Sequence, residues 1–371
     1  MLQRTTYWLK FALVLVAWFC FEKEAGAQAN EQYAAAGAAS RAAIQTMMQS
    51  SQTPAVSVAV AMNGEIVWSE AFGFADLEQK KRTTPEIRFG LGSVTKSFTA
   101  VLAARLVEEG KFDLDAPVAK YLPQFPHKNI TARLILAHLS GLNDAYNNAH
   151  YYEKRHLTTS AALEEILRAN TLAYPPRTRH EYTTSNFTIV AASIEQASGK
   201  DFATAMRQYV LQPLGLQRTS FNDRTHPLAE AAAFYVKEGN RVIKAPEYDP
   251  SFKWAGAGLL ANAEDVARYG AALLREGFLK PDTRAEIFRA LKTSSDEETN
   301  YALGWYVGKD KNGRRIYEHG GGGPGISSYI RLYPQEDCVL AILSNLTNAP
   351  VNGEVAPIVA EAFLQTKKPA Q

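Results

Sequence analysis

Residues 91–110 read LGSVTKSFTAVLAARLVEEG, and this stretch determines how the rest of the sequence is interpreted. Its apolar residues recur at intervals of three and four, which is the period of a helix face. They are Val94, Phe98, Val101, Leu102, Leu106 and Val107. Gly110 follows as a helix stop signal. The pattern predicts a helix from Ser93 to Glu109 that opens with a hydroxyl and an amine three positions apart.

Ser93 and Lys96 form a Ser-x-x-Lys pair on the first turn of this helix, where positions three apart share one face. Serine is a weak nucleophile until a neighbouring base accepts its proton. Lysine is such a base only where burial or nearby positive charge lowers its pKa. The helix N-terminus also makes the Ser93 N–H a candidate oxyanion donor. A helix cap followed by an exposed lysine has the same four letters, so the pair needs support from elsewhere.

Strand patterns lie on both sides of this helix in the sequence. Two β-favouring runs, 55–62 and 65–68, flank Asn63-Gly64, a pair that suits a type I′ turn because both central residues need positive φ. Further strand patterns follow late in the chain, at 303–307, 314–319, 327–333 and 338–344. Helical patterns fill the middle, at 160–170, 187–198, 202–211 and 263–275.

This order of patterns predicts an α/β (α+β) fold, with one antiparallel sheet built from both chain ends, flanking helices and a mostly helical inserted domain. Residues 28–110 and 291–371 would form the sheet domain, and residues 111–290 the insertion. Helical spacing at 33–49 and 355–364 supplies flanking helices. A site at the seam of the two parts is expected, because ligand pockets are commonly found there.

Composition and charge exclude several classes of protein. The chain has 371 residues, of which 46% are hydrophobic and 21% charged, so it is neither fibrous nor disordered. Forty Lys and Arg against 38 Asp and Glu give a net charge of +2, too little to favour nucleic acid as a partner.

Residues 1–27 have the pattern of a secretory signal peptide. Arg4 and Lys10 precede an apolar run at 11–21, and a small-residue cleavage site follows at 25–27, with cleavage after Ala29 as an alternative. The run of eleven is short of the roughly 20 residues of a bilayer-spanning helix. A secreted or periplasmic protein without a membrane anchor after cleavage is expected.

Cys338 is the one cysteine left after cleavage, because the other, Cys20, lies in the signal peptide. Bulky Phe19 before Cys20 argues against lipid attachment. A single thiol cannot form an internal disulfide. Cys338 opens an apolar run and is interpreted as a packed thiol of a buried strand.

Several stretches, in the same order along the chain, resemble the serine β-lactamase-like superfamily. That superfamily includes class C β-lactamases, D-alanyl-D-alanine carboxypeptidases, D-aminopeptidases and related esterases. The stretches are 91–110, 112–118, 121–123, 137–142, 254–259 and 318–325. The resemblance implies that Ser93 is the nucleophile and Lys96 its base, and it covers essentially the whole mature chain.

The resemblance also implies a tyrosine that relays protons, with an asparagine two residues later. Tyr182-Thr183-Thr184 is chosen because it follows Pro176 and leads directly into a helix; Thr184 then stands where asparagine is expected. A Tyr-x-Thr variant is similar to the branch of the mitochondrial serine β-lactamase-like protein, and it argues against true β-lactamase activity. Tyr146-Asn147-Asn148 fits the letters but lies in what is interpreted as a variable loop.

A third motif of the family, Lys-Thr-Gly on a strand, is replaced in many relatives by a histidine followed by glycines. His319-Gly320-Gly321 matches by position, whereas Lys292-Thr293-Ser294 is interpreted as a solvated loop. His319 could supply positive charge or a hydrogen bond near the substrate, or orient Tyr182. Gly321 lets the strand edge approach the substrate, and the Gly322 N–H would be the second oxyanion donor.

Other catalytic motifs are absent from the sequence. No Gly-x-Ser-x-Gly elbow exists, Thr95 occupies the second glycine position of a phosphate-binding loop, and the histidines show no metal-ligand spacing. We therefore expect no metal and no cofactor.

The sequence predicts an exported serine hydrolase that acts through an acyl-enzyme on an amide or peptide bond. A small-ester esterase or a class C-like β-lactamase is the alternative, and a non-catalytic binding or scaffold member of the same fold is a second one. A small molecule or a peptide is the expected partner. The loops around 143–155 and 226–250 give no indication of its identity.

Overall fold

The computed structural model describes residues 31–145, 153–169 and 171–366. The predicted signal peptide and Tyr146-Asn147 lie outside the described residues. None of the helices in the described part of the chain combines the length and the apolar composition that a bilayer span requires.

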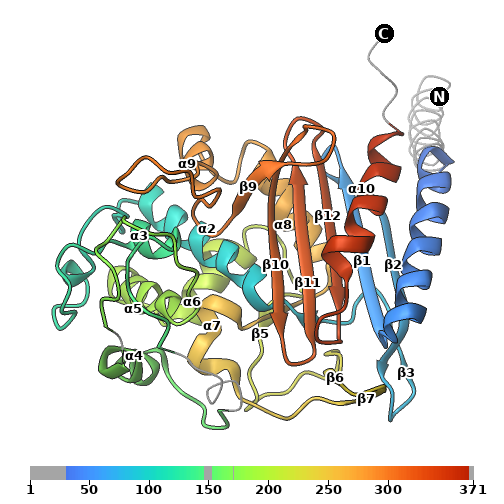
Figure 1. The fold of residues 1–371 in the computed structure, drawn as a ribbon, viewed down its shortest axis with the longest axis horizontal. Coiled ribbons are helices and arrows are strands. Elements are labelled where there is room, and N and C mark those ends of the chain that lie inside the picture. Colours follow the sequence, from blue (N-terminus) through green and yellow to red (C-terminus); the bar gives the residue numbers. More distant parts are fainter. Residues whose placement is uncertain (1–30, 146–152, 170, 367–371) are drawn as a thin grey trace, which may run out of the picture.

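The fold is organised around a seven-stranded antiparallel sheet with the order β3-β2-β1-β12-β11-β10-β9. Its strands come from the two ends of the chain, which confirms the predicted sheet (Figure 1). In chain order they are β1 (Ala55–Met62), β2 (Glu65–Asp76), β3 (Lys81–Arg82), β9 (Tyr306–Lys309), β10 (Arg315–Gly323), β11 (Ile326–Tyr333) and β12 (Cys338–Ser344).

The β1–β2 hairpin is confirmed: Asn63 and Gly64, with φ of 53° and 86°, form its two-residue turn. Cys338 is buried in β12, as predicted. One strand is displaced, because residues 303–307 were expected to be extended but β9 begins at Tyr306. Residues 301–305 form an apolar run that is buried in the core and ends where β9 begins.

The sequence of β1 explains how both faces of the sheet are covered. Alanines such as Ala59 and Ala61 belong to the core under α8 (Ala263–Leu274), whereas Val58 and Val60 belong to a second core. Short side chains on the first face let α8 approach the sheet, which it contacts on β1, β11 and β12. The second face is covered by the helix over residues 31–51 and by α10 (Ala356–Leu364) (Figure 1).

The middle of the chain is mostly helical, and one of its helices, α8, packs against the seven-stranded sheet. Its other α-helices are α3 (Ala132–Leu136), α4 (Thr159–Ala169), α5 (Asn186–Ser198), α6 (Phe202–Met206), α7 (Trp254–Ala257) and α9 (Pro281–Ile287). Shorter turns are the 3₁₀-helices η2 (Val118–Lys120) and η5 (Pro250–Lys253) and the π-helix η4 (Arg207–Leu211); a second π-helix, η6 (Val351–Val355), precedes α10. Two small sheets complete it: β4 (Phe89–Gly90), β8 (Leu259–Ala261) and β5 (Ser220–Phe221), and the hairpin of β6 (Tyr235–Glu238) and β7 (Arg241–Lys244).

Helix α2 (Thr95–Glu108), which the sequence places from Ser93 to Glu109, lies at the centre of the molecule. It packs against α5, α7, α9 and η4, so that almost all of its first ten residues are buried whatever their polarity. Such burial requires every polar side chain on the helix to have a partner. Thr95 accepts the Leu259 N–H and Thr99 donates to the Ala255 carbonyl, and both bonds tie α2 to the segment around α7.

Candidate active site

Ser93 lies in η1 (Gly92–Val94), a 3₁₀ turn that leads directly into α2. The sequence predicted an α-helix here, and the tighter turn brings side chains at positions i and i+3 into closer alignment. Gly92 has a φ of +48°, and a Cβ at this position would lie 2.8 Å from the backbone N and O of Gly322. Only glycine therefore fits before the nucleophile candidate.

Lys96 points back along α2 onto Ser93 and has no exposed surface. Its Nζ lies 3.2 Å from Ser93 Oγ, 3.2 Å from Thr184 Oγ1 and 3.0 Å from the carbonyl oxygen of Gly256. The structure thus brings together Ser93, Lys96 and Thr184, which come from two separate sequence motifs.

Burial changes the protonation of this lysine. The pKa of Lys96 falls from 10.5 to about 7, mainly because the buried ammonium loses its hydration; Asp144 opposes the shift and Lys253 adds to it. A neutral amine has two N–H donors and one lone pair. The Gly256 carbonyl and the Thr184 hydroxyl can accept the two N–H groups, which directs the lone pair to the Ser93 hydroxyl.

The Lys96 amine lies over the ring of Tyr182, with its Nζ 4.8 Å from the ring centroid. Buried His138 holds the Tyr182 segment in place, because its Nδ1 accepts the Thr183 N–H at 3.2 Å and its ring packs 4.3 Å from that of Tyr182. Asp144 accepts the N–H groups of Thr184 and Ser185, at 2.8 and 3.2 Å. The segment is therefore anchored on both sides of Thr184.

The glycines of β10 bring this strand against the nucleophile turn. A Cβ at Gly321 would lie 2.0 Å from the Leu91 carbonyl oxygen, and the backbone of Gly322 packs on Gly92. Ser328 Oγ donates to the same Leu91 carbonyl at 2.6 Å, which fixes η1 to β11. The predicted oxyanion donors, the N–H groups of Ser93 and Gly322, accordingly lie on neighbouring segments.

Of the three roles that the sequence left open for His319, the structure disfavours the supply of positive charge. It is buried, and burial together with the charge of Lys96 lowers its pKa to about 3. In the neutral ring, Nδ1 donates to the Gly320 carbonyl at 2.7 Å, so Nε2 accepts the hydroxyl proton of Tyr301 at 2.9 Å. Both nitrogens are therefore bonded within the protein, and the ring packs against those of Tyr182, Tyr301 and Tyr306.

The remaining sequence candidates stay apart from this site. Lys292 is partly exposed and pairs with Asp296 and Glu298 in a loop, as the sequence indicates. Within the described residues, no group of three or more His, Cys, Asp or Glu side chains is arranged to hold a metal ion.

Sequence reasoning missed three contributors: Asp144, Lys253 and the Gly256 carbonyl. Lys253 and Gly256 belong to one short segment, η5 and α7, and Lys253 directly precedes the 254–259 motif. That adjacency was a usable signal. Asp144 had none, because its interactions depend on how residues 183–185 turn in space.

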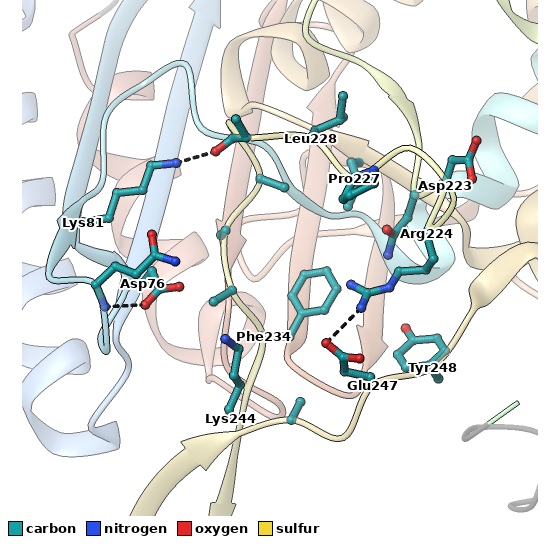
Figure 2. A pocket seen from close by; sticks show the side chains of 18 of the residues that line it. Asp76, Lys81, Asp223, Arg224, Pro227, Leu228, Phe234, Lys244, Glu247 and Tyr248 are labelled. Carbon is teal, nitrogen blue, oxygen red and sulfur yellow. Dashed lines mark hydrogen bonds and ion pairs between the residues drawn. The ribbon is translucent and has the colours of Figure 1, made fainter. Parts of the chain in front are cut away.

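A cavity of about 460 Å³ lies between the segment 222–234 and the segment 244–248 (Figure 2). Its charged side chains have partners in the protein, including Arg224 with Glu247 at 3.0 Å and Lys244 with Glu78 at 3.6 Å. In the described part of the chain, neither Ser93 nor Lys96 lines this cavity. This cavity is therefore separate from the Ser-x-x-Lys site.

A sheet built from both chain ends, with a Ser-x-x-Lys pair on the helix beside it, defines a serine β-lactamase-like protein. The chain belongs to the Beta-lactamase family, whose pattern matches residues 41–364.

Several known proteins are similar to this chain in sequence or in fold. The mitochondrial serine beta-lactamase-like protein LACTB of Homo sapiens is 25% identical over 83% of this chain and 76% of its own length. The octameric penicillin-binding protein homologue from Pyrococcus abyssi has a TM-score of 0.77 at 25% identity, covering 89% of this chain and 77% of its own. The D-amino acid amidase from Ochrobactrum anthropi SV3 shares the fold, with a TM-score of 0.78 at 22% identity, covering 89% and 99%. Membership of the family and the shared fold do not by themselves select one activity for this chain.

Proposed function

We propose that this protein is an exported serine hydrolase that cleaves an amide or peptide bond through an acyl-enzyme formed on Ser93. The observation that carries the proposal is the buried Lys96 amine with its three neighbours at 3.0–3.2 Å. Two of them accept N–H groups, so the lone pair can accept the Ser93 proton. A pKa of about 7 leaves roughly half of the amine neutral at neutral pH.

In the first half of the reaction, Ser93 Oγ attacks the substrate carbonyl carbon and its proton passes to Lys96. The N–H groups of Ser93 and Gly322 hold the oxyanion of the tetrahedral intermediate. The carbon–nitrogen bond then breaks, and the leaving amine takes the proton from Lys96 by way of the Tyr182 hydroxyl.

In the second half, water attacks the acyl-enzyme and gives one proton to Lys96. The ester bond to Ser93 breaks, the serine oxygen recovers that proton, and the acid product leaves. These steps need no cofactor.

Within the substrate class, we place amides and peptides, including D-amino-acid peptides, ahead of small esters and β-lactams. The similarity in fold to a D-amino acid amidase supports this order. At the family's asparagine position, Thr184 offers a hydroxyl bound to Lys96 and no amide to hold a substrate carbonyl, which disfavours β-lactams. Export rests on the pattern of residues 1–27, and N-terminal sequencing of the mature protein tests it.

Side-by-side assays test the proposed substrate class. Wild type and Ser93→Ala would be compared on D-alanyl peptides and amides, a p-nitrophenyl ester and a chromogenic cephalosporin. We expect turnover of an amide or peptide that Ser93→Ala lacks. Turnover of the ester alone, or of the cephalosporin alone, selects the corresponding alternative, and no turnover of any substrate favours a binding or scaffold protein.

A further inference from the structure

Lys253 is a second buried lysine beside the candidate active site. It ends η5, immediately before α7, and only 5% of its surface is exposed. Its ammonium lies over two aromatic rings, 4.9 Å from the centroid of Tyr248 and 5.1 Å from that of Phe252. Burying a charged amine costs free energy, so a lysine in this position needs an explanation.

The segment that carries Lys253 also binds the Lys96 side chain. Gly256, three residues later, supplies the carbonyl that accepts the Lys96 amine at 3.0 Å. A Cβ on Gly256 would lie 2.9 Å from Thr184, so α7 packs directly on the other partner of Lys96. Thr188 of α5 donates to the Phe252 carbonyl at 3.2 Å, which fixes this segment against α5. Lys253 is therefore held at a defined place relative to Lys96.

The charges around Lys96 are few, and they come from several elements. His138 and His319 face it but are neutral, because burial lowers both of their pKa values. Tyr182 contributes a ring face. That leaves the Asp144 carboxylate and the Lys253 ammonium as the charges acting on Lys96 among the described residues.

Around Lys253 itself, the facing groups are Asp144, Lys96 and the phenol of Tyr248. A more distant pair, His156 with Asp249 at 3.1 Å, lies at the start of η5.

We propose that Lys253 is a positioning residue of the active site, whose ammonium, buried three residues before the Gly256 carbonyl that binds the Lys96 amine, disfavours a second positive charge on Lys96 and keeps that amine able to accept a proton. The inference rests on the proposed function. Asp144 acts in the opposite sense, since a carboxylate near Lys96 stabilises the ammonium form. Burial lowers the pKa of Lys253 to about 8, and the Asp144 carboxylate opposes this shift by favouring the ammonium form of Lys253.

The test is the pH dependence of Ser93 phosphonylation by an uncharged fluorophosphonate, in which Oγ displaces fluoride from phosphorus, followed as intact mass from pH 5 to 9. For Lys253→Met, we expect the acid limb of the rate profile to move to higher pH by about one unit, because one nearby positive charge is lost. For Asp144→Asn, which keeps an acceptor for the Thr184 N–H, the limb moves to lower pH. Lys253→Arg retains the charge and restores the wild-type limb.

A purely structural role would lower the plateau of the profile without moving its midpoint. Lys292→Met, which removes a lysine from a solvated loop, serves as the matched control and leaves the profile unchanged. An unmoved midpoint in Lys253→Met overturns the inference, whatever Asp144→Asn shows. If Lys253→Met does not fold, Lys253→Gln, which also removes the charge, takes its place in the same comparison. Failure of the wild type to form any adduct at Ser93 refutes the proposed function instead.

Discussion

Lowering the pH below 7 should switch off the acylation of Ser93, because Lys96 then gains a proton. With a pKa of about 7, the neutral fraction of Lys96 is about one half at pH 7 and about 1% at pH 5. The rate of acylation should therefore fall about 50-fold between these two values. An exposed lysine with a pKa of 10.5 would be only about 0.03% neutral at pH 7 and would give a limb near pH 10.

The assay is the second-order rate of labelling by an uncharged fluorophosphonate at constant ionic strength. Lys96→Arg provides the control, because its guanidinium keeps the positive charge and cannot act as a base. We expect labelling slower by roughly 10²- to 10⁴-fold, with no limb near pH 7. A wild-type rate that stays flat from pH 5 to 8, or a Lys96→Arg variant that labels at the wild-type rate, would refute the role given to Lys96.

Three further predictions follow from the same geometry. Between pH 7 and 9 the unfolded chain keeps a proton on Lys96 that the folded protein has lost. The free energy of unfolding of wild type should therefore rise by about 2 kcal/mol over this interval relative to that of Lys96→Met, as measured by urea unfolding. Equal changes of this free energy with pH in the two proteins would contradict the prediction. Gly92→Ala should slow labelling and lower the free energy of unfolding by more than the roughly 1 kcal/mol that a side chain at positive φ costs. Gly239→Ala is the control, because Gly239 has a φ of +59° but open space around its Cβ position, so only the cost of positive φ is expected. Equal losses of stability in thermal unfolding of the two variants would exclude the contact with Gly322. Thr184→Val removes one acceptor of the Lys96 amine and should slow labelling about tenfold, so an unchanged rate would remove Thr184 from the site.

Local patterns made the nucleophile turn and the sheet predictable. The Ser93–Lys96 spacing follows from helix geometry, and Asn63-Gly64 specifies its own turn. The displacement of β9 shows the limit of this reasoning, because Tyr301 and Trp305 belong to an apolar run that fills the core without forming a strand.

Properties that depend on burial or on contacts between distant segments could not be predicted in this way. His319 was found by its glycines, but its pKa is lowered by burial and by the charge of Lys96, and neither can be read from the sequence. The effect of Asp144 on the pKa of Lys253 depends on two segments far apart in the sequence, which meet through the packing of α7 against Thr184 and the hydrogen bond from Thr188 to Phe252.

Intact-mass measurement after incubation with the fluorophosphonate tests the central claim most directly, since it asks whether the Ser93 oxygen is activated at all. At pH 8 the account predicts a single adduct on wild type, which peptide mapping places on Ser93, and none on Ser93→Ala. A folded wild-type protein that stays unmodified, or an adduct that persists in Ser93→Ala, would contradict it.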